Sequence, residues 1–215
     1  MNQLRRLYRS MMRSTRRKAG LIPRQFRRDR VLFIHVPKCA GSAFLDAYLG
    51  FQTGHVTAQD YHDADPDFFA AAYVFAFVRN PLARFVSAYN HIQTDDLWPV
   101  LPAVRLLVDR QGATVSEVAA SLRPDSELLR MPWFTPQHTF LEVRGRCAVN
   151  RAFKTESFAA DLEVITADVP IRLRLSTEVN RRGREQTPPD AGLSAESVAN
   201  LRRIYSRDFT LFGYY

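Results

Sequence analysis

Positions 37–43 hold a run of small residues around one lysine: Pro37, Lys38, Cys39, Ala40, Gly41, Ser42 and Ala43. The run lies between an apolar, β-branched segment and an amphipathic one, which predicts a strand, a tight loop and a helix. Small side chains let a phosphate approach the N–H groups at a helix start, where the helix dipole is positive. Lys38 adds a full charge and Ser42 a hydroxyl donor. The run therefore indicates an anion-binding loop, with an ordinary strand-to-helix turn as the alternative.

This loop differs from the phosphate loop of ATPases and GTPases. Their loop has the pattern Gly-x-x-x-x-Gly-Lys-Ser/Thr, whereas here Lys38 precedes Gly41 and the loop is shorter. No obvious aspartate that could bind Mg²⁺ ends a later predicted strand. The pattern argues against ordinary ATP or GTP hydrolysis and leaves a nucleotide kinase or NTPase as a rival function.

A second group of polar residues follows the apolar run at residues 73–78. Arg79 comes at the expected carboxyl end of this strand, where open α/β sheets bind their ligands, and Ser87 lies eight residues further on. A guanidinium can hold a phosphate through two parallel hydrogen bonds. We expect Arg79 to bind an anion, with a structural ion pair as the alternative.

These residues need a scaffold that brings two strand ends to one edge of a sheet. Residues 31–36 and 73–78 are apolar and rich in β-branched and aromatic side chains, which predicts two buried strands. Apolar residues recur with helical spacing over 44–51 and again after Pro81, where Asn80 is a suitable N-cap. Two such units predict an α/β fold, a three-layer P-loop-like arrangement with a central parallel sheet flanked by helices.

The rest of the chain gives weaker signals. Further helices are predicted over 101–108, 116–122, 157–165 and 194–205, and further strands over 148–153 and 171–175. Residues 181–192 are rich in Arg, Gly and Pro, which predicts a mobile loop. The helix over 194–205 is expected to be the last element.

The net charge of +8 is distributed unevenly over the 215 residues. Residues 1–30 contain 11 Lys/Arg and one acid, a net +10, whereas residues 31–215 contain 19 Lys/Arg and 21 Asp/Glu, a net −2. We therefore expect a basic N-terminal arm, residues 1–30, before one domain of residues 31–215. The arm is a solvated tail or a segment that binds anionic membrane, with a transit peptide as a further alternative. No nucleic-acid partner is expected for a domain of this charge.

The small number of cysteines and the lack of long apolar segments predict the cellular compartment and the metal content. Cys39 and Cys147 are too few for a disulfide framework or a four-cysteine zinc site, so we expect a reducing environment and no metal. No apolar run approaches the ~20 residues that span a bilayer, and the basic N-terminus lacks the apolar stretch of a secretory signal. The predicted location is the cytoplasm, with peripheral contact of the arm at the inner membrane face.

The two polar segments together resemble the donor site of the sulfotransferases. Residues 36–42 (Val-Pro-Lys-Cys-Ala-Gly-Ser) are similar to their 5′-phosphosulfate loop, Pro-Lys-Thr-Gly/Ala-Gly-Thr-Ser. Residues 78–89 are similar to their 3′-phosphate motif, Arg-Asp/Asn-Pro-x-x-Arg-x-x-Ser-x-Tyr. Weaker similarities follow in the right order at 54–56 (Gly-His-Val), 133–137 (Trp-Phe-Thr-Pro-Gln) and 208–214 (Asp-Phe-Thr-Leu-Phe-Gly-Tyr). The chain is most similar to the family that includes heparan sulfate 2-O-sulfotransferases and bacterial carbohydrate sulfotransferases.

The resemblance implies a reaction and roles for four residues. The donor would be 3′-phosphoadenosine 5′-phosphosulfate (PAPS), and its sulfuryl group would pass to a hydroxyl of a carbohydrate, either a glycan or a glycolipid. Lys38 would stabilise the leaving oxygen, and Arg79 and Ser87 would hold the 3′-phosphate. His55 is the candidate base for the acceptor hydroxyl, because imidazole titrates near neutral pH; the alternative is that it only positions the acceptor. His35, inside a predicted strand, is expected to be a core histidine.

Two loop residues depart from the family pattern. Cys39 stands where threonine is usual, and Ala43 where serine is common, so each removes a hydroxyl that could bind the phosphosulfate. The thiol beside Lys38 could be prone to oxidation, although a small buried thiol that fills space is the simpler interpretation. The remaining rival function is a binding module in which the basic arm meets nucleic acid or anionic lipid. Deleting residues 1–30 would abolish that role and leave a sulfotransferase site intact.

Overall fold

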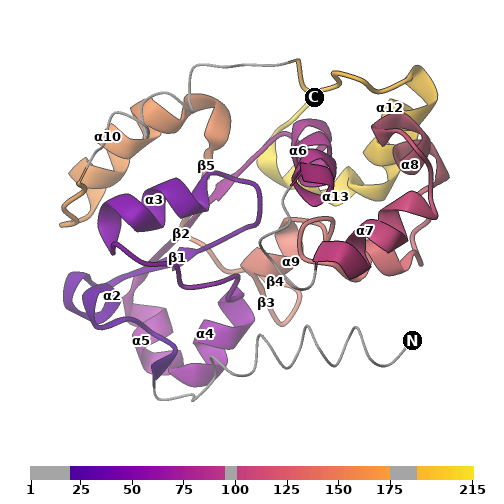
Figure 1. The fold of residues 1–215 in the computed structure, drawn as a ribbon. Helices are drawn as coiled ribbons and strands as arrows, with labels where there is room; N and C mark the ends of the chain where they lie inside the picture. The colour runs from indigo at the N-terminus through magenta and orange to yellow at the C-terminus, as the bar shows by residue number, and fades with distance from the viewer. Residues whose placement is uncertain (1–19, 95–100, 175–187) are drawn as a thin grey trace. The chain divides into compact units, whose positions relative to one another are not determined.

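The protein is described here from a computed structural model that covers residues 20–94, 101–174 and 188–215. The described residues belong to two compact units (Figure 1). The sheet unit contains described residues 20–79 and 137–174, and the helical unit contains described residues 80–136 and 188–215. No helix of the described residues is long and apolar enough to cross a membrane.

The sheet unit is built on three parallel strands in the order β1-β2-β5. They are β1 (Val31–Ile34), β2 (Tyr73–Val78) and β5 (Arg151–Lys154). In the central strand, Ala76 lies opposite Ile34 of β1 and Ala152 of β5. A two-stranded antiparallel hairpin accompanies the sheet, formed by β3 (Glu142–Val143) and β4 (Arg146–Cys147). The predicted α/β fold with a parallel sheet packed against helices is confirmed.

Helices cover both faces of this sheet (Figure 1). They are α2 (Arg24–Asp29), α3 (Gly41–Tyr48), α4 (Ala58–Ala64), α5 (Pro66–Ala71), α9 (His138–Leu141) and α10 (Phe158–Asp168), with the 3-10 turn η3 (Thr155–Ser157) before α10. α3 packs on one face through Phe44, whose ring lies 4.6 Å from that of Phe33 on β1. α10 packs on the same face, where Phe158 lies 4.7 Å from Phe77 of β2. Alternate residues of a strand point to opposite faces, so the odd-numbered phenylalanines of β1 and β2 form one aromatic layer.

The helical unit contains the remaining elements. These are α6 (Pro81–Thr94), α7 (Leu101–Asp109), α8 (Val115–Ser121), the 3-10 turn η2 (Glu127–Arg130), α12 (Ala195–Ile204) and α13 (Ser206–Phe212). α6 begins as predicted, because the Asn80 side chain accepts a hydrogen bond from Leu82 N and Pro81 takes the first helical position. α12 follows its N-cap, Ser194, whose side chain accepts a hydrogen bond from Ser197 N. It is not the last helix, since α13 follows it directly.

Three other predicted elements need correction. The first strand ends at Ile34, before His35. The helix of the loop ends at Tyr48, and Phe51, predicted to lie on its apolar stripe, is 52% exposed. Residues 171–174 form no strand; Arg174 N instead donates to Ala47 O at α3. Among the described residues the parallel sheet consists of β1, β2 and β5, and residues 171–174 pair with none of these strands. Of the predicted 181–192 loop, residues 181–187 lie outside the described residues.

One helix lies within the predicted basic arm. In α2, Phe26 is fully buried and stacks on Tyr48 of α3 with ring centroids 5.9 Å apart. Asp29 is buried and accepts hydrogen bonds from Tyr48 Oη (2.7 Å) and Arg28 Nε (2.8 Å). Residues 24–29 thus pack as part of the sheet unit, while the boundary at residue 30 stays a prediction.

Candidate active site

The predicted anion loop has an unusual backbone between β1 and α3. Lys38 and Ala40 both have left-handed φ, at 66° and 57°, a region that side chains other than glycine rarely adopt. Ala40 is the N-cap of α3 and supplies no side-chain hydrogen bond to the first turn. A left-handed residue before a helix start makes successive N–H groups converge, a geometry that binds anions. The loop is therefore shaped as a backbone cradle for a negatively charged group.

Gly41 is needed at the first position of α3 because the His35 ring packs against it. A β-carbon on Gly41 would overlap the imidazole of His35, whose Cγ would lie 3.1 Å away. The His35 ring in turn lies 4.5 Å from the ring of His55. The start of the loop helix, the buried histidine and the candidate base are therefore packed against one another.

His35 is buried, with 5% of its surface exposed, which confirms it as a core histidine. Burial, together with the neighbouring His55, holds the pKa of His35 well below its usual value. A hydrogen bond with the Gly54 backbone acts in the opposite direction and raises this pKa, but its effect is smaller. Its Nδ1 has no hydrogen-bond partner among the residues that the structure describes. The ring is neutral at physiological pH and adds no charge to the site.

The hydrogen bond of His55 fixes its tautomer. Its Nδ1 lies 3.1 Å from the backbone carbonyl oxygen of His35. A carbonyl only accepts hydrogen bonds, so Nδ1 must carry the proton. In the neutral ring the lone pair is then on Nε2, which suits that nitrogen to take a proton from a hydroxyl.

At the end of β2, a glutamine joins Arg79 to the loop. Gln137 is fully buried. Its Oε1 accepts from Arg79 N (2.9 Å), and its Nε2 donates to Arg79 O (2.8 Å). The Cys39 thiol, also fully buried, donates to the same Oε1 at 3.2 Å. The Cys39 side chain therefore faces the protein interior, and its part in binding the donor stays a prediction.

The other predicted site residues differ in exposure and in the unit that holds them. Within the sheet unit, Lys38 and Arg79 are half-buried, Ser42 is exposed, and Pro37 and Ala43 are buried. Because Ala43 is buried, the hydroxyl of a serine at this position would begin at a buried β-carbon. Ser87 lies on α6, in the helical unit, and is half-buried. The structure thus brings the loop, His55 and Arg79 together in the sheet unit.

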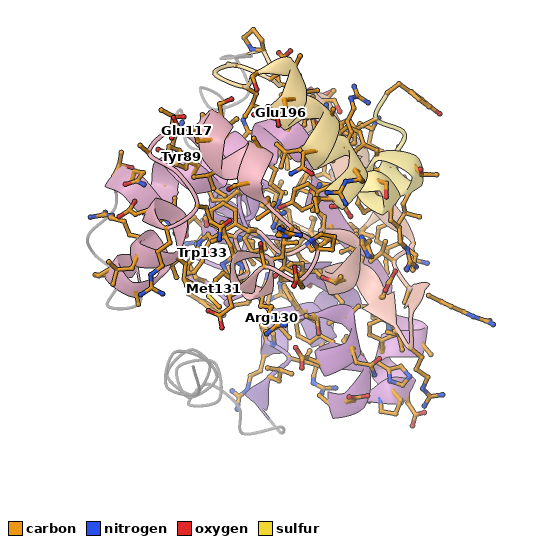
Figure 2. All side chains as sticks on the ribbon, turned by 90° about the vertical axis from the view of Figure 1, so that its right-hand side faces the viewer. Tyr89, Glu117, Arg130, Met131, Trp133 and Glu196 are labelled. Carbon is orange, nitrogen blue, oxygen red and sulfur yellow. The ribbon has the colours of Figure 1, made fainter. Side chains whose placement is uncertain are left out.

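Two further residues of the 78–89 motif hold the helical unit together. Arg84 is buried, and its guanidinium donates to Thr135 O (2.9 Å) and Pro132 O (3.0 Å). Tyr89 Oη donates to Ala113 O (3.0 Å), beside Glu117 in Figure 2. Burial and two nearby carboxylates raise the pKa of Tyr89, so it remains a donor. Both residues therefore stabilise the fold of the helical unit.

Sequence reasoning did not assign a role to Gln137. It appeared only as the last residue of a weak similarity at 133–137, 58 positions from Arg79 and 98 from Cys39. Residues so far apart in the sequence are not related by any local spacing. The only indication in the sequence was that the Pro-Gln pair of the resemblance places a polar residue, Gln137, after Pro136.

The arrangement fits a ligand with two anionic groups. The converging N–H groups and Lys38 suit one phosphate or sulfate, and the end of β2 offers the Arg79 guanidinium for a second. His55 offers a proton acceptor next to the first group. A positioned base and fixed cations are what transfer of a sulfuryl or phosphoryl group to a hydroxyl requires.

Comparison with known proteins gives one match. A family profile described as "Sulfotransferase family" matches residues 24–117, which include the loop, His55, Arg79 and Ser87. No curated protein and no solved structure matches the chain significantly. Over residues 24–117 the chain therefore belongs to the sulfotransferase family, and it is a transferase that uses PAPS as its donor.

Proposed function

We propose that the protein transfers the sulfuryl group of PAPS to a hydroxyl of a carbohydrate acceptor, a glycan or a glycolipid. The observation that supports this most is the packing of His35 between Gly41 and His55. It places a proton acceptor with a fixed tautomer beside the left-handed loop at the start of α3. PAPS supplies the activated sulfuryl group, and the chain supplies orientation, cations and a base.

Donor binding is assigned to the loop and to the end of β2. Backbone N–H groups of residues 40–43 and the Ser42 hydroxyl would hold the 5′-phosphosulfate, with Lys38 at the leaving oxygen. Arg79 would hold the 3′-phosphate, which only a 3′-phosphorylated nucleotide carries; the role of Ser87 at this phosphate stays a prediction from the resemblance. Two anchors on opposite ends of one nucleotide fix its orientation as well as its affinity.

His55 is assigned the acceptor proton. The proton on its Nδ1 is held by the His35 carbonyl, so Nε2 accepts the proton of the attacking hydroxyl. The neutral, buried ring of His35 limits rotation of the His55 ring by packing against it. This arrangement needs no metal ion, and we expect turnover to be unaffected by EDTA.

The carbohydrate acceptor is supported by resemblance. The Gly-His-Val segment at 54–56 and the segments at 133–137 and 208–214 resemble segments of the family that includes carbohydrate sulfotransferases. Transfer of labelled sulfate from PAPS to a panel of glycans, lipid-linked saccharides and small phenols tests the proposal. We expect the saccharides to become labelled and the phenols to remain unlabelled. The reverse result would assign another acceptor class without affecting donor use.

We further propose that the enzyme is cytoplasmic and that its basic N-terminal arm binds anionic lipid at the inner face of a membrane, which would place it near a glycolipid acceptor. The support is the net +10 of residues 1–30 in a chain whose remaining residues sum to −2. A polybasic segment gains about 1 kcal/mol per basic residue near an anionic surface. Salt-sensitive binding to vesicles that contain phosphatidylserine, and none to vesicles of phosphatidylcholine alone, is the expected result.

A further inference from the structure

We propose that Gln137 is a positioning residue that fixes the distance between the two phosphate-binding parts of the donor site. Its side chain makes three hydrogen bonds with two other segments of the chain: two with the backbone of Arg79 and one with the thiol of Cys39 in the loop. All three lie in the sheet unit. The proposal rests on the donor site assigned above.

The orientation of the Gln137 amide follows from its partners. The backbone N–H of Arg79 can only donate and its carbonyl can only accept, so Oε1 must face the first and Nε2 the second. Oε1 is then the atom that Cys39 Sγ reaches, and the thiol must be the donor. No alternative flip of the amide satisfies both groups of Arg79.

The carboxamide takes the place of a neighbouring strand. Pairing of β2 with β5 ends at Val78 opposite Lys154, one residue before Arg79. A primary amide that accepts from the N–H and donates to the C=O of one residue does what a paired peptide group does in a sheet. Gln137 thus extends the order of β2 to Arg79, where the side chain must aim at a ligand.

The hydrogen bond to Cys39 connects Gln137 to the anion-binding loop. Cys39 lies between Lys38 and Ala40, the two left-handed residues that shape the loop. One amide therefore restrains both the residue that carries the 3′-phosphate contact and the loop that receives the 5′ group. A ligand with both phosphates profits from a fixed spacing, whereas a ligand with one phosphate does not.

The test compares Gln137→Met, which keeps the side-chain volume and removes all three hydrogen bonds, with Asn150→Ala. Asn150, just before β5, is a matched control that binds the same strand, β2: its Oδ1 accepts from Val74 N and its own N–H donates to Val74 O, both at 2.7 Å. It clamps β2 near its other end. Binding of 3′,5′-bisphosphoadenosine and of adenosine 5′-phosphate is measured by calorimetry, with unfolding temperatures for each variant.

In Gln137→Met we expect the affinity for the bisphosphate to fall about tenfold or more, as for a lost hydrogen bond to a buried backbone group. The affinity for adenosine 5′-phosphate should stay within about twofold. Asn150→Ala should lower the unfolding temperature and leave the ratio of the two affinities unchanged. The ratio is measured on folded protein, so partial loss of stability does not obscure it.

Two results would overturn the proposal: an unchanged ratio in Gln137→Met, or an equal change of the ratio in both variants. Failure of the donor site itself looks different. In that case the unaltered protein, and not only the variant, would bind the bisphosphate and adenosine 5′-phosphate equally well.

Discussion

The proton on one ring nitrogen of His55 decides what this residue can do. Its Nδ1 donates to the His35 carbonyl, which leaves the lone pair on Nε2. Three spatial facts support a base at this place: the tautomer, the neutral histidine packed beside it, and the start of α3 at Gly41, against which that histidine packs. None of the three is visible in the Gly-His-Val segment alone.

His55→Gln is expected to lower kcat by ~10²–10⁴-fold with donor affinity intact, because an amide can hydrogen-bond a hydroxyl but cannot take its proton. The rate of the unaltered enzyme should rise with pH through one ionisation, since His35 stays neutral. Steady-state kinetics from pH 5 to 9 would check both. A near-normal rate in the glutamine variant would reduce His55 to a residue that positions the acceptor.

Lys38→Ala should lower kcat by more than it weakens binding of 3′,5′-bisphosphoadenosine. A cation at the leaving oxygen interacts more strongly as negative charge develops there, so its effect belongs to the transition state. Comparison of kcat with calorimetric affinity separates the two contributions. A raised KM with unchanged kcat would make Lys38 a clamp for the bound donor only.

At the scale of elements, the start of α3 depends on a close approach between a helix and a ring. Gly41→Ala should reduce both stability and affinity for 3′,5′-bisphosphoadenosine, because its β-carbon would overlap the His35 ring. Overpacking of this kind typically destabilises by about 1–3 kcal/mol. Thermal unfolding and calorimetry provide the measurements, and Gly20→Ala is the control, since no atom lies within 4 Å of a β-carbon there.

A second variant identifies the cause of that effect. Removing the ring in His35→Ala/Gly41→Ala should restore much of the bisphosphate affinity, since the overlap disappears. If the double variant binds as weakly as Gly41→Ala alone, the glycine is required for another reason than the approach of His35.

The contact of α2 with α3 predicts a pH effect on stability. Burial opposes the ionisation of Asp29, but hydrogen bonds from Arg28 and Tyr48 outweigh it and hold its pKa below 3.8. A carboxyl group whose pKa is lower in the folded protein than in the unfolded chain stabilises the fold. This stabilisation is fully present above the unfolded pKa and is lost as the pH falls through the folded pKa. Asp29→Asn should therefore unfold at a lower temperature at pH 7, and the difference should narrow below pH 3.8.

The exposed Glu163 on α10 provides the control for this prediction. Glu163→Gln should follow the unaltered protein at every pH. The difference in unfolding temperature between Asp29→Asn and the unaltered protein could also stay the same under acid conditions. That result would mean that the charge of Asp29 does not hold α2.

For the molecule as a whole, the point of truncation matters. Removal of residues 1–19 deletes seven of the eleven basic residues of the arm and keeps α2. This truncation should abolish vesicle binding and leave the unfolding temperature and nucleotide affinity unchanged. Removal of residues 1–30 should also destabilise the protein, since it takes away the buried Phe26 and Asp29.

Equal unfolding temperatures for the two truncated proteins would contradict the packing role of α2. Strong vesicle binding by the protein that lacks residues 1–19 would assign the lipid contact to residues 20–215. Either result is read from the same pair of proteins by calorimetry and vesicle sedimentation.

Local patterns in the sequence determined the strands β1 and β2, the small-residue loop and the start of α6. Each depends on neighbours in the chain: a run of buried side chains, the flexibility of small residues, a capping asparagine before a proline. The paired loop and arginine motifs, which lie 41 positions apart from Lys38 to Arg79, identified the family by order and spacing.

Only the tertiary structure decided how these parts are held. The alternating residues 171–174 are not a strand, because a strand exists only where another offers its hydrogen bonds. The roles of Gln137 and His35 rest on contacts with residues far away in the sequence or on the fit of a ring against a glycine. Hydrogen bonds and packing of this kind depend on the positions of atoms after folding, which no short-range pattern encodes.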